Sequence, residues 1–102
     1  MTAGSGIMHE EKLPAAERLL GVQLWLNLPA KAKMAPPAYH SIKNADIEEI
    51  EFNWGKLRLL AGEFEGSKGY MSSYLPLDYY DLHLNPKESV ILHTETDRSV
   101  MV

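Results

Sequence analysis

The stretch Gly21-Val22-Gln23-Leu24-Trp25-Leu26-Asn27-Leu28 carries the clearest structural pattern in the chain. Its even-numbered positions are all apolar, whereas its odd-numbered positions include two amides and a tryptophan. Side chains that follow one another along a strand point to opposite faces, so this period of two predicts a β-strand. Pro29 has no backbone N–H to donate and ends the predicted strand.

Shorter strand-like runs follow downstream. The segment 46–52 and the segment 56–61 are separated by Asn53-Trp54-Gly55, which predicts a hairpin. After an excursion that contains Gly62, Gly66 and Gly69, residues 79–84 and 89–93 predict two more strands, and residues 99–102 predict the opening of another.

The connecting segments have no comparable periodicity. Residues 30–40 contain Pro36-Pro37 and predict a surface connection, and residues 14–20 are helix formers over about two turns only. We expect a loop or a single helical turn there. Many short strands separated by turns predict an all-β fold, a sandwich or a barrel, with short helical turns at most.

Composition limits the class of protein. The chain has 102 residues, of which 45% are hydrophobic and 24% charged, as in one small globular domain. Its 14 acidic and 10 basic residues give a net charge of -4, which disfavours binding to nucleic acid. No apolar run reaches the ~18–20 residues of a membrane helix, and no secretory signal pattern is present. We therefore expect a cytoplasmic protein without a membrane partner.

The chain has no cysteine, so a metal ion would have to be held by histidine and carboxylate. The triplet His9-Glu10-Glu11 offers both groups, because residues i and i+2 of an extended segment project to the same side. An imidazole and a carboxylate together are part of a site for a first-row metal, as in non-haem Fe(II) oxygenases. A plain surface role for the triplet stays open at this point.

Three strings identify a family resemblance. Residues 1–11 (MTAGSGIMHEE), residues 21–29 (GVQLWLNLP) and residues 33–39 (KMAPPAY) together resemble the pirin family of the cupin superfamily. The similarity continues through residues 60–63 (LAGE) and 79–86 (YYDLHLNP) and so covers most of the chain. The resemblance implies a partial cupin, a double-stranded β-helix of the jelly-roll type, taken from a protein with two such barrels.

The resemblance also implies a chemistry. Pirins bind one metal ion, usually iron, through three histidines and one glutamate, and some members cleave the flavonol quercetin as 2,3-dioxygenases. Other members are described as nuclear or regulatory interaction proteins. The family pattern matches His9 to the last histidine ligand and Glu11 to the glutamate. It implies Fe(II) or another divalent first-row metal, a flavonol substrate, and a catalytic role for Glu11 as acceptor of the substrate's hydroxyl proton.

The same resemblance implies that the metal site is incomplete in this chain. Pirins carry two further histidine ligands on an H-x-H segment that precedes the first string, and this sequence begins at that string. We expect residues 1–42 to correspond to the C-terminal part of the metal-binding cupin. Residues 43–50 would be a crossover, and residues 51–102 would be the first strands of the second cupin.

The other candidate residues have ordinary interpretations. His40 is expected to be solvated, and His83 and His93 to be strand residues outside any site. Trp25 and Trp54 are expected to pack in the fold, since aromatic side chains supply buried area. The acidic run 48–51 predicts a solvated strand face. The remaining candidates could rim a pocket for a flat phenolic ligand and are four tyrosines: Tyr70, Tyr74, Tyr79 and Tyr80.

Three functions remain open from the sequence. The first is a pirin-like, iron-dependent quercetin 2,3-dioxygenase. The second is a non-catalytic truncated pirin that acts as an interaction module or as one part of an oligomer, because unpaired strand edges recruit further strands. Such a chain would associate with itself or with a complementing chain. The third is a gene remnant without function.

Overall fold

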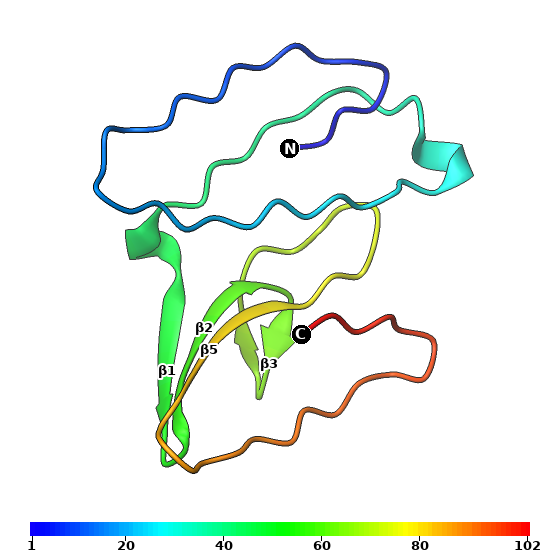
Figure 1. The fold of residues 1–102 in the computed structure, drawn as a ribbon. Helices are drawn as coiled ribbons and strands as arrows, with labels where there is room; N and C mark the ends of the chain where they lie inside the picture. Colours follow the sequence, from blue (N-terminus) through cyan, green and yellow to red (C-terminus); the bar gives the residue numbers. More distant parts are fainter.

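A computed structural model describes residues 1–102, and its regular structure consists of two small antiparallel sheets. Figure 1 shows the larger sheet, which has the strand order β1-β2-β5. Its strands are β1 (Glu48–Phe52), β2 (Gly55–Ala61) and β5 (Tyr79–Leu84). The smaller sheet pairs β3 (Glu63–Phe64) with β4 (Ser67–Lys68), and two single 3-10 turns complete the elements, η1 (Ala30–Ala32) and η2 (Asn44–Asp46). The predicted all-β class, with short helical turns at most, is confirmed and is consistent with a partial cupin-like fold.

The hairpin predicted around residues 53–55 is confirmed. β1 pairs with β2 from Glu48 opposite Leu59 to Phe52 opposite Gly55, which leaves a two-residue loop. Gly55 has φ +141°, and a Cβ atom at this position would lie 2.0 Å from the carbonyl oxygen of His83. Because that oxygen belongs to the backbone of β5, only glycine lets the hairpin and β5 approach so closely.

The segment between β2 and β5 contains a hairpin that the sequence analysis missed. β3 and β4 are joined by Glu65 and Gly66, whose φ angles are +47° and +89°. Two consecutive positive φ angles are typical of the type I′ turn that favours tight hairpins. With only two residues per strand, this hairpin has no alternating pattern from which the sequence could predict it.

The core lies on one face of the larger sheet. The residues that β2 places there, Leu57, Leu59 and Ala61, are 0%, 1% and 4% exposed. Fully burying a leucine side chain contributes about 1.5–3 kcal/mol, so β2 supplies much of the driving force for folding. Aromatic rings extend this layer: Phe52 stacks on Trp54 at 4.7 Å between centroids, and Phe64 meets both Phe52 and Tyr80 edge to face.

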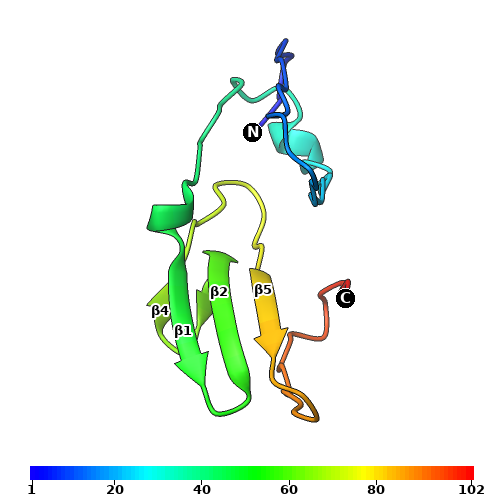
Figure 2. The ribbon, with the colours of Figure 1, turned by 60° about the vertical axis from the view of Figure 1, so that its left-hand side comes forward.

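The N-terminal part of the chain has little regular structure. No backbone hydrogen bond involves residues 7–28, whereas Thr2 and Ala38 form an isolated bridge. In Figures 1 and 2 this part forms loops above the larger sheet. The loop prediction for residues 14–20 is therefore confirmed, and residues 30–40 form a connection that includes η1.

Three strand predictions are wrong for this structure, namely residues 21–28, 89–93 and 99–102. A period of two selects a face for each side chain, but a strand also needs a neighbour that accepts and donates backbone hydrogen bonds. None of these segments has such a neighbour. In consequence Trp25, expected to pack, is 85% exposed, whereas Trp54 packs as predicted.

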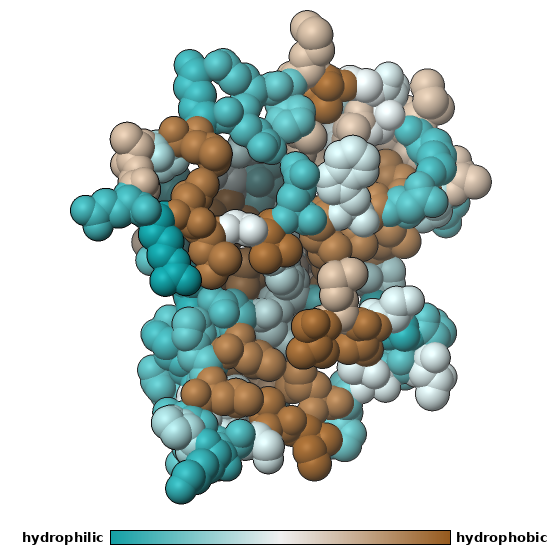
Figure 3. Space-filling view, in the orientation of Figure 1, coloured by the Kyte–Doolittle hydropathy of each residue, from teal (hydrophilic) through white to brown (hydrophobic).

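The molecule is more open than a typical domain of its length. Its radius of gyration is 15.9 Å, against about 13 Å for a compact chain of 100 residues. Figure 3 shows hydrophobic side chains at the surface of both the upper and the lower part. No helix in the structure has the length and apolar character needed to span a membrane.

Candidate metal ligands and the polar sheet face

His9 and Glu11 lie close together, as their spacing predicts. The Nδ1 atom of His9 is 3.8 Å from Oε1 of Glu11, and their side chains are 44% and 64% exposed. Two donor atoms that each bind one metal ion at about 2.0–2.2 Å can be at most about 4.4 Å apart, so this separation suits a shared ion. The donor types, an imidazole nitrogen and a carboxylate oxygen, also suit a first-row metal.

The number of donors does not complete a site. Nowhere in the structure do three or more His, Asp or Glu side chains gather closely enough to hold a metal ion. Catalytic zinc sites and facial-triad iron sites use at least three protein ligands. This chain therefore presents two donor side chains of the expected kind, with no third donor beside them.

The other histidines lie in different surroundings. The ring of His40 stacks on Tyr70 with 4.9 Å between centroids, and the Nε2 atom of His83 lies 3.2 Å from Oδ2 of Asp81. His93 is exposed in the segment after β5. His83 lies in β5 as predicted, whereas His93, predicted to be a strand residue, lies outside every strand.

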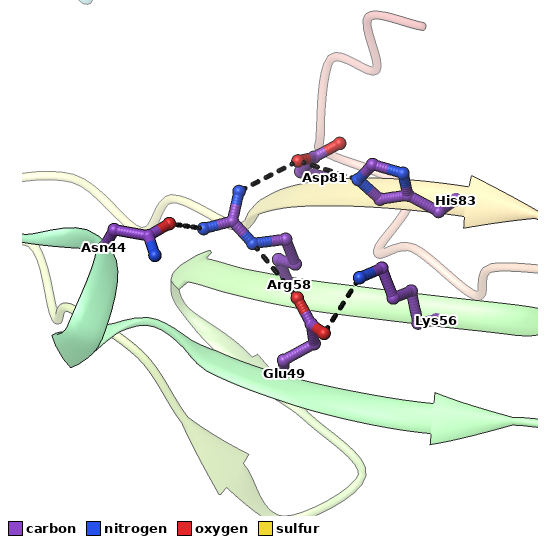
Figure 4. Close-up of polar contacts among 6 residues, drawn as sticks. All are labelled: Asn44, Glu49, Lys56, Arg58, Asp81 and His83. Atoms are coloured by element: carbon purple, nitrogen blue, oxygen red, sulfur yellow. Dashed lines mark hydrogen bonds and ion pairs between the residues drawn. The ribbon is translucent and has the colours of Figure 1, made fainter.

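Opposite the core, the larger sheet carries a cluster of charged side chains, which Figure 4 shows. We call it the polar sheet face; it comprises Glu49 of β1, Lys56 and Arg58 of β2, Asp81 and His83 of β5, and Asn44 of η2. Arg58 is central: its Nε lies 3.4 Å from Oε2 of Glu49, its Nη1 lies 3.3 Å from Oδ2 of Asp81, and its Nη2 donates to Oδ1 of Asn44.

Glu49 receives a second cation from the same strand. The Nζ atom of Lys56 donates to Oε1 of Glu49 at 2.9 Å, and this hydrogen bond is the main reason that the pKa of Glu49 lies below its usual value. The two cations balance the two carboxylates, so the polar sheet face is a set of ion pairs that joins three strands. The prediction of a solvated face for the acidic run is confirmed for its three exposed glutamates. The cross-strand pairing of Glu49 with Arg58 could not be predicted from the sequence pattern.

Two of the four tyrosines line a groove. A hollow of about 470 Å³ lies between the N-terminal part and the end of the larger sheet, and Tyr70 and Tyr79 form part of its wall. Tyr39 and His40 contribute from the connection before η2. Tyr74 and Tyr80 lie outside this lining, so the predicted rim of four tyrosines is present only in part.

Comparison with known proteins places the chain in a family. It is 37% identical over 91 residues to a pirin-like protein of Arabidopsis thaliana, and the aligned region covers 84% of the chain. It is 37% identical over 99 residues, or 90% of the chain, to a predicted quercetin 2,3-dioxygenase of Pseudomonas aeruginosa. Human pirin is 35% identical over 86 residues, or 84% of the chain. The chain belongs to the pirin family.

The match to pirins covers only part of the longer proteins. The aligned region amounts to 29%, 35% and 30% of the Arabidopsis, Pseudomonas and human proteins, so the chain spans about a third of these pirin relatives. No family model matches the chain. No solved structure matches it either.

Proposed function

We propose that this chain is part of a pirin-type, metal-dependent quercetin 2,3-dioxygenase and supplies His9 and Glu11 as two of the ligands of an iron centre. The observation that carries the proposal is the His9–Glu11 pair, with donor atoms 3.8 Å apart, in a chain 37% identical to a predicted quercetin 2,3-dioxygenase. The proposal assigns residues 1–42 to the metal-binding cupin, residues 43–50 to a crossover and residues 51–102 to the second cupin.

The two residues would have different roles. His9 would offer the lone pair of an imidazole nitrogen, which requires the neutral ring. Glu11 would offer a carboxylate that is both a ligand and a base within reach of a flavonol hydroxyl proton. A bound ferrous ion would supply Lewis acidity and redox chemistry. The remaining ligands would come from a second polypeptide segment, because no third donor lies beside these two.

A second candidate function is a non-catalytic component of an assembly. The observation that favours it is the incomplete ligand set, together with apolar side chains that remain exposed in the N-terminal part. In this case the chain would bind a partner without holding a metal ion. The two candidate functions differ in whether His9 and Glu11 bind a metal ion.

Anaerobic equilibrium dialysis against Fe(II) separates them. The purified chain is measured alone and after addition of the segment of the Pseudomonas relative that precedes the matched region. We expect about one iron per complex only in the mixture, and loss of at least tenfold in affinity in both His9→Ala and Glu11→Ala. The matched controls are Glu10→Ala and His93→Ala, which should bind as the unmodified chain does.

Iron uptake that neither His9→Ala nor Glu11→Ala reduces would overturn the metal assignment. A mixture that takes up no iron would overturn it as well and would favour the non-catalytic component. If iron binds as expected, oxygen consumption with quercetin tests the reaction, and the same two substitutions should abolish it.

A further inference from the structure

We propose that residues 21–28 form an interaction surface that pairs, as an antiparallel strand, with the same residues of a second copy of this chain. The proposal does not depend on metal binding or on the dioxygenase reaction. It rests on three properties of this segment: its unpaired backbone, its self-complementary order of side chains, and its lack of charged residues.

The segment has the composition of a strand, but its backbone lacks a partner; the side chain of Asn27 accepts a hydrogen bond from Lys33. None of its backbone N–H or C=O groups is hydrogen-bonded within the chain. Val22 is 78% exposed, Trp25 85% and Leu26 49%. Exposed apolar residues in strand alternation, with a free backbone on both edges, are typical of a segment that adds to another strand.

The order of side chains makes the segment complementary to itself. When two copies run antiparallel about a two-fold axis at Trp25, Val22 lies opposite the partner copy's Leu28, and Leu24 lies opposite the partner copy's Leu26. On the other face Gln23 lies opposite the partner copy's Asn27. Every pair joins side chains of one chemical kind, and matched cross-strand pairs stabilise a sheet.

The lack of charge in the segment is compatible with the same arrangement. No charged residue occurs from Leu19 to Ala30, so the paired segments bring no like charges together. A slip by one residue would put apolar side chains opposite amides, so registers displaced by one residue are disfavoured.

Pro29 selects between the two hydrogen-bonding patterns of this pairing. In antiparallel strands, hydrogen-bonded and non-hydrogen-bonded pairs alternate. Pro29 cannot donate, so it is tolerated only where a non-hydrogen-bonded pair falls. Because the two kinds of pair alternate along the strand, Trp25, four residues before Pro29, also falls in a non-hydrogen-bonded pair with its copy. In such pairs the side chains lie closer together. The two indole rings would then contact each other across the axis.

One edge of the larger sheet, the strand β1, is a poorer partner. The free edge strand β1 carries Glu48, Glu49 and Glu51, and charges on an edge strand discourage strand addition. The uncharged segment 21–28 lacks this protection. A two-stranded ribbon is only marginally stable, so we expect a weak dimer whose population rises with concentration.

Sedimentation equilibrium and tryptophan emission test the proposal. Trp54→Phe leaves Trp25 as the sole tryptophan, because the chain contains two. As concentration rises, we expect the mass to double and the emission of Trp25 to move to shorter wavelength. Circular dichroism of each variant checks that the sheet is folded.

Charge variants test the register. Gln23→Lys combined with Asn27→Lys places two lysines opposite each other on both sides of the axis and should weaken the dimer at least tenfold. Gln23→Lys combined with Asn27→Glu places a lysine opposite a glutamate and should restore it. The matched control is Ile91→Lys, at an apolar residue that is 81% exposed in another segment, and it should leave the dimer unchanged.

Three results would overturn the proposal. The first is a chain that stays monomeric at every concentration, with Trp25 in water. The second is a dimer that responds equally to both double variants or dissociates in Ile91→Lys. The third is a monomer that associates only with a segment of a longer pirin, which would assign the strand to a different partner.

Discussion

Gly55 carries a tight steric constraint within the larger sheet. Its φ is +141°, and an added Cβ would lie 2.0 Å from the carbonyl oxygen of His83 and 3.0 Å from the carbonyl carbon. We predict that Gly55→Ala destabilises the fold by at least about 1–3 kcal/mol, because the strained backbone and the displaced strand both cost free energy. Urea unfolding followed by circular dichroism measures the loss. The matched control is Gly21→Ala, whose Cβ would meet no atom within 4 Å; equal stability of both variants would contradict the prediction.

Leu57 is the residue on which the core depends most. It is 0% exposed at the centre of β2, between β1 and β5. We predict that Leu57→Ala lowers the free energy of unfolding by about 2–5 kcal/mol, since the substitution removes buried apolar area and leaves a cavity. Thermal or urea unfolding measures the effect. Leu20→Ala, at a residue that is 87% exposed, should change stability by no more than about 0.5 kcal/mol, and a comparable loss there would contradict the prediction.

At the scale of elements, Tyr80 links β5 to the β3–β4 hairpin. Its hydroxyl donates to the carbonyl oxygen of Glu63 at 2.6 Å, and burial, followed by the charge of Asp78, raises its pKa above the usual 10.0. The neutral phenol is therefore favoured in the fold, so stability is fully present below about pH 10 and declines as pH rises through the raised pKa. We predict that Tyr80→Phe loses about 0.5–1.5 kcal/mol at neutral pH.

Tyr80→Phe should also reduce the loss of stability that occurs as pH rises above 10. Urea unfolding at a series of pH values measures both effects. Tyr39→Phe, at a tyrosine that is 73% exposed, is the control. An unchanged alkaline decline in Tyr80→Phe would assign that decline to other groups.

The ion pairs of the polar sheet face predict that the stability of the fold falls at acidic pH. The pKa of Glu49 lies below its usual value of 4.5, chiefly because Lys56 donates a hydrogen bond to it. A carboxyl group whose pKa falls on folding stabilises the fold above its unfolded pKa, and this contribution is lost as pH falls below 4.5 and through the lowered value. Glu49→Gln should therefore reduce the acid-induced loss of stability, measured as unfolding midpoints from pH 6 to pH 3. Glu51→Gln is the control, and equal effects of the two would contradict the role of Lys56.

The sequence predicted those elements that have both a local pattern and a partner within the chain. β1, β2 and β5 alternate, and each pairs with another of the three. The segment 21–28 alternates more regularly than any of them and remains unpaired, because periodicity does not specify which backbone will lie beside it. At the candidate site, spacing alone predicted the proximity of His9 and Glu11, a local relation. The contacts of Arg58 with Glu49 and Asp81 join three strands and depend on the sheet register, which the sequence does not reveal.

At the scale of the whole molecule, order is concentrated in the sheet. The chain extends over 46 × 41 × 21 Å, and its largest fully buried side chains, Leu57 and Leu59, both belong to β2. The N-terminal part contributes few backbone hydrogen bonds and most of the exposed apolar side chains. Amide hydrogen exchange should therefore be slow in the sheet and fast in the N-terminal part, since protection follows hydrogen bonding and burial.

We predict that at low concentration the amides of residues 7–28 exchange almost as fast as in an unfolded chain, and that those of β2 exchange slowest. At high concentration, pairing about Trp25 with Pro29 in a non-hydrogen-bonded position should slow the amides of Val22, Leu24, Leu26 and Leu28. The amides of Gln23 and Asn27 should stay fast, because they point away from the partner. Residue-resolved exchange by NMR measures this alternation. Uniform protection from residue 21 to residue 28 would indicate strands on both edges, and therefore a sheet of more than two copies or an additional partner.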